Sequence, residues 1–527
     1  MLSRGNSEFE IRNRSLILKN EDKSENKPGR STALQTNRSA DTLSKKSASE
    51  DKLELKREVG LFSAVNLIVG VMIGSGIFVS PSMALQRAGS VGLCLTIWAI
   101  CGMISLLGAL CFAELGLVVP RSGAEYAYFL EAYGGLHKFW GPLPSFICSW
   151  VYVMVLRPSE VAIIILTFSE YICRPLEFYM GQIPEESRDW VKRLIAISAL
   201  SLLTYINYAS VKLFVRIQNI FTITKLMVCI IIVLGGVYEL CAGNTKNISR
   251  GFDGTNLSVR DISLAFYSCL WPYDGWSTVT SVTEEVKNPE KNILRSIVIA
   301  VPLVTTVYFL TNVAYMTVLT HAEMLASSAV AVSFGERILG VMSFIMPLGV
   351  AISTFGCALS IQFSVTRLCY VSGRQGHMME VFSYINIHRL TPAPAVILQG
   401  LLSLTFILAG NIAELIDFAS FLIWMFYGVA MVALMILRRS KKDVERPFKV
   451  QLWVPIFIIL VALFLCLLPI ITDPSPWYFI ALGLIGIGVI VYIPFVFLNL
   501  RPNWLISKFT YLIQVLMQVV PAEQQPD

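Results

Sequence analysis

The sequence contains many apolar runs that reach the roughly 20 residues needed to cross a bilayer as an α-helix. Of its 527 residues, 55% are hydrophobic and only 15% are charged, whereas a soluble domain has about 25% charged residues. Lipid offers the backbone no hydrogen-bond partners, so only helices and closed barrels can span it. The sequence therefore predicts an all-α polytopic membrane protein.

Polar segments divide the apolar runs into twelve expected spans and set the domain boundaries. We expect a disordered cytosolic tail at 1–58, a twelve-helix domain at 59–500 and an amphipathic cytosolic segment at 501–527. The spans are expected at about 59–84, 91–118, 144–170, 191–210, 213–239, 261–285, 295–319, 341–372, 393–410, 413–437, 452–471 and 477–499.

Charge sets the expected orientation of these spans. The loop RRSKKDVERPFK is the most basic in the chain, and basic loops stay in the cytosol. With this loop inside, both termini are cytosolic. The loop 241–260 is then outside, with sequons at Asn247 and Asn256 whose glycosylation the sequence leaves open. The formal charge of +6 is too modest to suggest a nucleic-acid partner, and no metal-ligand spacing or cofactor motif occurs.

The first span is interrupted at its centre. Val65–Pro81 reads VNLIVGVMIGSGIFVSP, with Gly74-Ser75-Gly76 in the middle, and glycine is a poor helix former. Unwound backbone at membrane depth is tolerated where it lines a cavity. Its N–H groups can hold a carboxylate and its C=O groups an ammonium, which suits an α-amino acid. The alternative is a small-residue face for helix packing.

A second cluster of helix breakers, WPYDGW at 271–276, lies in the sixth span. The first and sixth spans are five spans apart, so they cross the membrane in opposite directions. This pattern is typical of inverted five-helix repeats, here about 59–239 and 261–437 followed by two extra helices, with a substrate site between them. It favours a transporter.

Four side chains within the spans stand out: three are candidates for function, each with a structural alternative, and the role of the fourth, Glu160, is left open. Trp271 could shield a bound substrate or serve only in packing. Asp274 could meet a cationic group or cap the second half-helix. Lys225 could bond carbonyls of the broken first helix in place of a sodium ion, or extend to the interface. Glu160 can pair with Arg157 one turn earlier.

Three acidic residues lie near the inner ends of spans. Ion pairs of Glu114 or of the pair at 284–285 with Arg121 or Arg367 would close an inner gate; ordinary solvation is the alternative. Cys173 is interpreted as a lone thiol in an exposed outer loop. A leftover thiol in an oxidising compartment suggests a disulfide to another chain, and an unpaired buried thiol is the alternative.

Seven segments carry a resemblance to a known family: IVGVMIGSGIFVSP, GALCFAELG, SGAEYAYFLEAYG, FTITKL, WPYDGW, TEEVKNPEKN and GHMMEVFSYINIHRLTPAPA. Through them, the chain from about residue 55 to the C-terminus resembles the light subunits of heteromeric amino acid transporters in the APC superfamily. The YDGW motif and the ending YLIQVLMQVVPAE are most similar to the b(0,+) branch, and an aromatic-preferring relative of that branch is the alternative.

The resemblance implies a LeuT-like fold and sodium-independent exchange of amino acids in the plasma membrane, with apical placement in epithelia left open. It implies a disulfide through Cys173 to a single-span glycoprotein heavy subunit of the rBAT type. It also implies roles for individual residues: substrate α-groups at Ile73, Gly74, Ser75, Gly76 and Ile77; a gate at Trp271; cation preference at Asp274; the second break at Gly275; a vacant sodium site filled by Lys225; and pocket lining by Ser353 and by aromatics near Phe421 and Trp424.

The chain departs from the family pattern in three places. Pro272 and Glu160 replace small residues, and 356–360 reads GCALS where the family has an asparagine. These departures leave open whether neutral, aromatic or cationic amino acids, or cystine, are transported. An amino acid receptor that does not transport is the alternative from another class. An enzyme is not expected, since no nucleophile–base pair or HExxH motif occurs.

Overall fold

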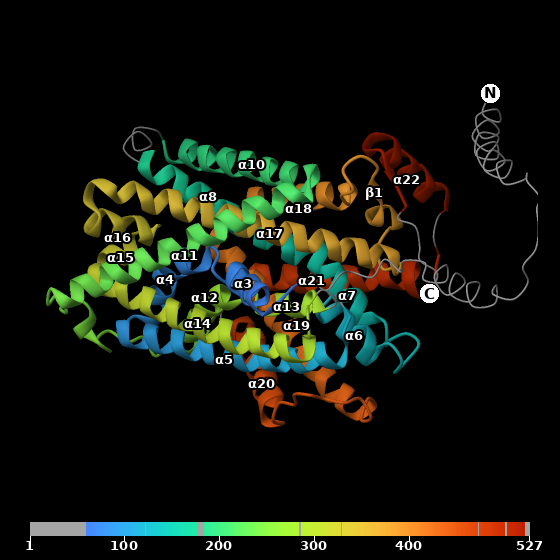
Figure 1. Ribbon diagram of the computed structural model, residues 1–527, viewed down its shortest axis with the longest axis horizontal. Helices are drawn as coiled ribbons and strands as arrows, with labels where there is room; N and C mark the ends of the chain where they lie inside the picture. The colour runs from blue at the N-terminus through green and yellow to red at the C-terminus, as the bar shows by residue number, and fades with distance from the viewer. Residues whose placement is uncertain are drawn as a thin grey trace, which may run out of the picture. The chain divides into compact units, whose positions relative to one another are not determined.

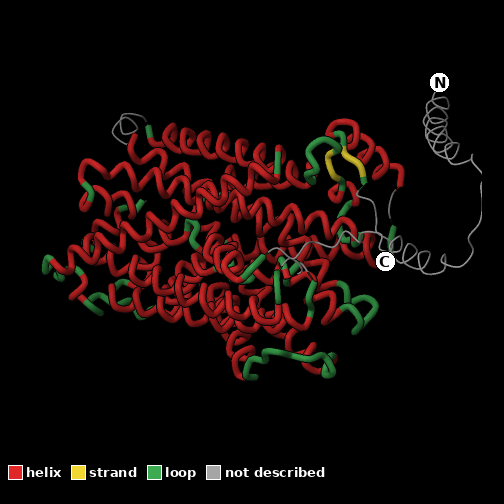
Figure 2. Tube along the Cα trace, viewed as in Figure 1, coloured by secondary structure: helices red, strands yellow, loops and turns green. Residues whose placement is uncertain are grey.

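The computed structural model describes residues 59–121, 123–176, 184–283, 286–327, 329–472, 474–500 and 503–521. The predictions for the tail at 1–58 and for the acidic pair at 284–285 fall outside these residues. Most of the described chain is helical (Figure 2). The prediction of an all-α polytopic membrane protein is confirmed.

Within the described residues, eight helical stretches are long and apolar enough to cross a membrane. The bent pair α3 (Leu61–Met72) and α4 (Gly76–Ala88), which meet at 47°, would make a ninth. The eight are α5 (Val91–Val118); α7 (Leu143–Val151) with the π-turn η1 (Tyr152–Leu156) and α8 (Arg157–Cys173); α11 (Val211–Cys241); α14 (Pro289–Val318); η6 (Gly340–Phe344) with α17 (Ile345–Arg374); α19 (Ile412–Ser440); α20 (Trp453–Thr472); and α21 (Pro476–Tyr492) with η8 (Ile493–Phe497).

The other three predicted spans correspond to helices that fail this length or hydropathy test. They are α10 (Glu185–Ala209), α12 (Val259–Leu270) and α18 (Ala393–Ala409). The count of twelve therefore stays a prediction. The remaining helices are short or lie beside the spans: α6 (Glu125–Tyr133), α13 (Thr278–Ser281), α15 (His321–Ala326), α16 (Val330–Ile338) and α22 (Asn503–Met517).

Side-chain caps help to position the helix ends. Ser90 Oγ accepts the Leu93 N–H at the start of α5, and Asn411 Oδ1 accepts the Glu414 N–H at the start of α19. A capping residue of this kind contributes roughly 1 kcal/mol, because it satisfies an N–H that the helix itself leaves open. These caps fix where two of the longest spans begin.

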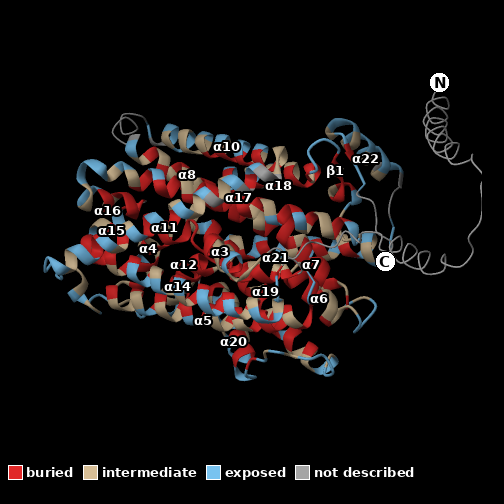
Figure 3. Ribbon diagram, viewed as in Figure 1, coloured by how far each residue is buried: buried red, intermediate tan, exposed pale blue. Residues whose placement is uncertain are grey.

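Apolar side chains fill the interior and also cover the outer faces. One continuous hydrophobic cluster runs through the helices, and buried residues are concentrated between them (Figure 3). Large apolar side chains on α11, α20 and α21 are exposed, such as Ile223, Leu460 and Ile490. Exposed apolar surface on this scale is normal only where another apolar phase covers it, which on a polytopic chain is lipid.

Helices at corresponding places in the two predicted repeats pack against each other. The broken helix α4 packs on α12, and α8 packs on α17 (Figure 1). In addition, α3 packs on α14 and α17. The two interrupted segments therefore meet inside the helix bundle and are enclosed by longer helices.

The described C-terminal segment ends on the loop that joins α17 to α18. After α22, the strand β2 (Val519–Val520) pairs antiparallel with β1 (Ile385–Asn386) (Figure 1). Asn386 Nδ2 donates to Met517 O at 2.7 Å, and Val519 is buried. This short pairing, which the sequence did not suggest, anchors the amphipathic segment to the helix domain.

Candidate functional site

The first break leaves the carbonyl end of α3 to be satisfied by neighbouring helices. Lys225 Nζ, on α11, donates to Gly70 O at 2.6 Å and is fully buried. Tyr308 Oη, on α14, donates to Met72 O at 2.6 Å. A helix end buried without such partners would cost free energy for every unpaired carbonyl. Lys225 thus contacts the broken helix, which is one of the two positions that the sequence left open, while Tyr308 was not predicted.

On the other side of the break, three backbone donors face no acceptor. Among the described residues, no hydrogen bond is found for the N–H groups of Ser75, Gly76 and Ile77. The first protein acceptor at the start of α4 is Ser75 O, which receives the Phe78 N–H at 3.0 Å. Buried N–H groups are rarely left unpaired. Three in succession at a helix N-terminus can bind an anion such as a carboxylate.

The second break is wider than the sequence suggested. Helix α12 ends at Leu270 and a 3₁₀ turn, η4 (Trp271–Tyr273), follows. Asp274 is extended and Gly275 has φ +110°, which favours glycine. The expected second half-helix is only the four-residue α13. The proline and the glycine together keep the backbone from resuming a long helix.

The two breaks touch each other. A Cβ atom on Gly76 would lie 2.7 Å from Pro272, and one on Gly275 would lie 2.6 Å from Val71. Tyr308 Oη lies 3.0 Å from Pro272 O as well as against α3, so it bridges the breaks. Gly76 and Gly275 thus allow both the unwinding and the close packing of the two segments. The first break can therefore be both an unwound substrate cradle and a small-residue packing face.

The departure at 356–360 also lies at the first break. Cys357 Sγ, on α17, is 3.8 Å from Val71 O, within reach of a weak S–H hydrogen bond. A Cβ atom on Gly74 would lie 2.7 Å from the same sulfur. One turn earlier, Ser353 is fully buried and its Oγ has no hydrogen-bond partner among the described residues. Ser353 does not line the cavity described next.

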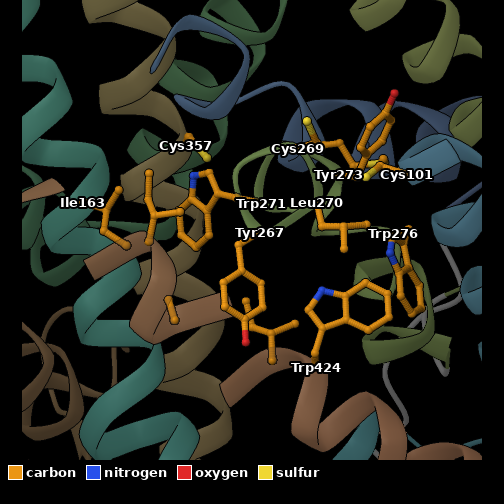
Figure 4. Close-up of a cluster of buried hydrophobic side chains, with 14 of the residues drawn as sticks. Cys101, Ile163, Tyr267, Cys269, Leu270, Trp271, Tyr273, Trp276, Cys357 and Trp424 are labelled. Atoms are coloured by element: carbon orange, nitrogen blue, oxygen red, sulfur yellow. The ribbon is translucent and has the colours of Figure 1, made fainter. Parts of the chain in front are cut away.

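A small cavity lies beside the second break. Its volume is about 10 Å³, and its walls include Trp271, Asp274, Trp424 and Tyr427. The indoles of Trp271 and Trp424 belong to one buried cluster with Trp276 (Figure 4). A cavity of this size holds about one water, so an amino acid can enter only if the walls move. The backbone of 73–77 and Lys225 are not part of its lining.

Asp274 faces this cavity and two polar side chains. Tyr427 Oη donates to Asp274 Oδ1, and Arg157 Nη1 lies 3.9 Å from Asp274 Oδ2. The same Arg157 nitrogen makes the predicted ion pair with Glu160, at 2.6 Å. No side chain caps α13, so the alternative that Asp274 acts as a helix cap is wrong in this structure.

Ion pairs join the helices above and below the breaks. At one end, Arg87 Nη2 on α4 lies 2.7 Å from Asp417 Oδ2 on α19, and Arg87 also donates to Leu264 O and Ser268 Oγ on α12. This contact ties both broken segments to α19. Arg87 belongs to the last turn of α4, which extends beyond the predicted end of the first span at about residue 84.

At the other end, the partners of Glu114 and Arg121 differ from those expected. Glu114 on α5 pairs with Arg438 on α19 at 2.5 Å, and Arg121 contacts Glu131. A separate hollow of about 480 Å³ opens between the end of α5 and the start of α14, lined in part by Pro120 and 288–291. Both ends of the bundle therefore carry an ion pair, and this hollow shares no lining residue with the cavity at the second break.

The expected place of Cys173 is wrong. It is the last residue of α8 rather than a loop residue, and it is 3% exposed. Cys241, the last residue of α11, is the exposed cysteine among the described residues. The periodicity of the α8 segment continues through SEYIC, and this is the signal that could have placed Cys173 in the helix.

Comparison with known proteins extends over almost all of the described chain. The amino acid permease family profile matches residues 59–512. The b(0,+)-type amino acid transporter 1 of Mus musculus is 46% identical over 474 residues, which is 90% of this chain and 95% of the relative. The cystine/glutamate transporter of Homo sapiens is 40% identical (90% and 93%), and the large neutral amino acids transporter small subunit 2 of Mus musculus is 40% identical (88% and 86%).

Proposed function

The chain belongs to the amino acid permease family, and from this premise we propose that it is a sodium-independent amino acid exchanger, the light subunit of a heteromeric transporter. It is a transporter, not an enzyme. The observation that carries the proposal is the contact between two interrupted helices, bridged by Tyr308, beside three unpaired N–H groups. Broken helices that meet at mid-membrane are how secondary transporters build substrate sites.

In this proposal the substrate α-carboxylate binds the N–H groups of Ser75, Gly76 and Ile77. The α-ammonium binds the carbonyls of Ile73 and Gly74, which no described donor occupies. The side chain then extends toward the cavity at the second break. Trp271 closes over it, and the walls retreat to admit it, because about 10 Å³ is too little for an amino acid.

Alternating access follows from the ion pairs at the two ends of the bundle. If the basic loop at 438–449 is cytosolic, the Arg87–Asp417 contact closes the outer side. The hollow between α5 and α14 then opens toward the cytosol. With Glu114 and Arg438 also paired at the inner side, the cavity is closed at both ends, and outward opening requires that Arg87 release α19. The pairing of α4 with α12 and α8 with α17 supports movement of two related repeats.

The test is counter-transport by the purified full chain in proteoliposomes. We expect labelled leucine or arginine to enter vesicles preloaded with unlabelled amino acid, at equal rates in sodium and choline buffers. Empty vesicles should take up little label. Binding of label without uptake into preloaded vesicles would indicate the receptor alternative. Equal uptake into empty vesicles would rule out obligatory exchange.

We propose that Cys173 forms a disulfide with a single-span heavy subunit of the rBAT type, which requires the last turn of α8 to expose it. Co-expression of the chain with such a subunit should give a band of the summed mass on a non-reducing gel. Cys173→Ser should remove more than nine-tenths of that band, because serine cannot form the disulfide. The matched control Cys241→Ser should keep the band. The reverse result would assign the link to Cys241.

A further inference from the structure

Glu160 is a carboxylate buried in the membrane domain, and the substrate contacts proposed above do not include it. Its side chain is 2% exposed, and its Oε1 has no hydrogen-bond partner among the described residues. It does not line the cavity at the second break. Buried acids inside a membrane domain are costly, so one that is kept needs a partner or a task.

The partner of Glu160 is Arg157, which also faces Asp274. Arg157 Nη1 lies 2.6 Å from Glu160 Oε2 but 3.9 Å from Asp274 Oδ2. The contact with Glu160 is short enough to be a charge-assisted hydrogen bond, whereas the contact with Asp274 is too long for a hydrogen bond. The guanidinium also lies over the Tyr152 ring, 5.1 Å from its centre. One cation is therefore placed between two carboxylates and bonded to one of them.

The local charge balance favours an added cation. One guanidinium faces the carboxylates of Glu160 and Asp274, and the buried carboxylate of Glu125 on α6 is close enough to interact electrostatically with Arg157 and Asp274. Asp274 is the member of this set that lines the cavity. With Arg157 bonded to Glu160, Asp274 keeps only the longer contact with this cation and the hydrogen bond from Tyr427, so its charge remains available to a cation in the cavity.

The backbone makes the position of Arg157 sensitive to its partner. The π-turn η1 ends at Leu156, directly before Arg157, and π-turns within helices occur mostly at functional sites. Glu160 lies one helical turn further along α8, where the side chains of residues i and i+3 meet. If Glu160 lost its charge, the guanidinium would keep Asp274 as its nearest described carboxylate.

We propose that Glu160 sets the charge selectivity of the site by holding Arg157 away from Asp274, so that Asp274 can receive a cationic substrate side chain. Glu160 is thus a positioning residue, and the inference rests on the proposed exchange function. Without Glu160, Arg157 takes the place of the substrate cation on Asp274. The site then prefers neutral amino acids.

Uptake by four proteins in proteoliposomes tests this: wild type, Glu160→Gln, Arg157→Met and the double variant. We expect Glu160→Gln to raise the KM for arginine at least fivefold and to change that for leucine less than twofold. The double variant should return the arginine KM to within twofold of wild type, because Asp274 is again unopposed. Removing both partners of a buried pair is also tolerated better than removing one.

Two outcomes would overturn the inference. If the double variant is as poor for arginine as Glu160→Gln, Glu160 acts on the substrate without Arg157. If Glu160→Gln loses arginine and leucine transport equally, its role is structural. Should Glu160→Gln not fold, Glu160→Asp replaces it, with a smaller rise for arginine alone; an unchanged arginine KM would then contradict the inference. Leucine exchange by wild type tests the proposed function separately.

Discussion

Lys225→Met should reduce leucine exchange about tenfold or more, with no change in the amount of protein reconstituted. Methionine fills much of the same space but cannot donate a hydrogen bond, so Gly70 O at the end of α3 loses its 2.6 Å partner. An unpaired buried carbonyl costs about 1–3 kcal/mol, and the broken helix would shift to recover it. The measurement is the initial rate of counter-transport in preloaded vesicles.

Lys246→Met is the matched control, because Lys246 is exposed in the loop after α11. Its exchange rate should equal that of wild type. Lys225→Ala tests whether Lys225 fills a vacant sodium site. The smaller side chain leaves room for an ion, so sodium should restore more exchange activity than choline does. A wild-type rate for Lys225→Met in choline buffer would show that the ammonium is not needed at the break.

Asp274→Asn should raise the KM for arginine about tenfold or more and leave that for leucine nearly unchanged. The carboxylate lines the cavity, and Tyr427 fixes its orientation by donating to Oδ1. A hydrogen bond to a charged group contributes about 1.5–3 kcal/mol, which is a factor of roughly ten to a hundred in affinity. Asparagine keeps the shape and removes the charge.

Asp253→Asn serves as the control, since Asp253 is an exposed acid outside the spans. Competition of arginine, leucine and tyrosine for labelled leucine would show the effect as a change in ranking. An equal loss for all three substrates would mean that Asp274 shapes the backbone of the second break and does not select charge. A gain for tyrosine alone would favour the aromatic-preferring alternative.

Much of this architecture follows from local sequence. Apolar runs of membrane length predict helices because lipid leaves the backbone no other partner. Glycine, proline and their spacing predict both breaks, because these residues change backbone preferences wherever they occur. The Arg157–Glu160 pair is also a local prediction, since it depends only on helical spacing.

The contacts between distant segments could not be predicted in this way. Nothing in the sequence around Tyr308 or Tyr427 distinguishes them from other tyrosines in apolar helices, yet one bridges the two breaks and the other orients Asp274. The gate pair between Arg87 and Asp417 joins residues 330 positions apart. Cys173 was predicted to be exposed but is buried, because its burial depends on how the end of α8 packs against its neighbours.

By itself, then, the sequence determined that the chain is a polytopic helical membrane protein and where two of its helices must break. Those properties depend on a residue and its nearest neighbours along the chain. Only the tertiary structure decided which groups satisfy the broken ends and which three N–H groups remain unpaired. A hydrogen bond depends on the relative position of two atoms to within a few tenths of an ångström, and the packing of helices far apart in sequence sets that position.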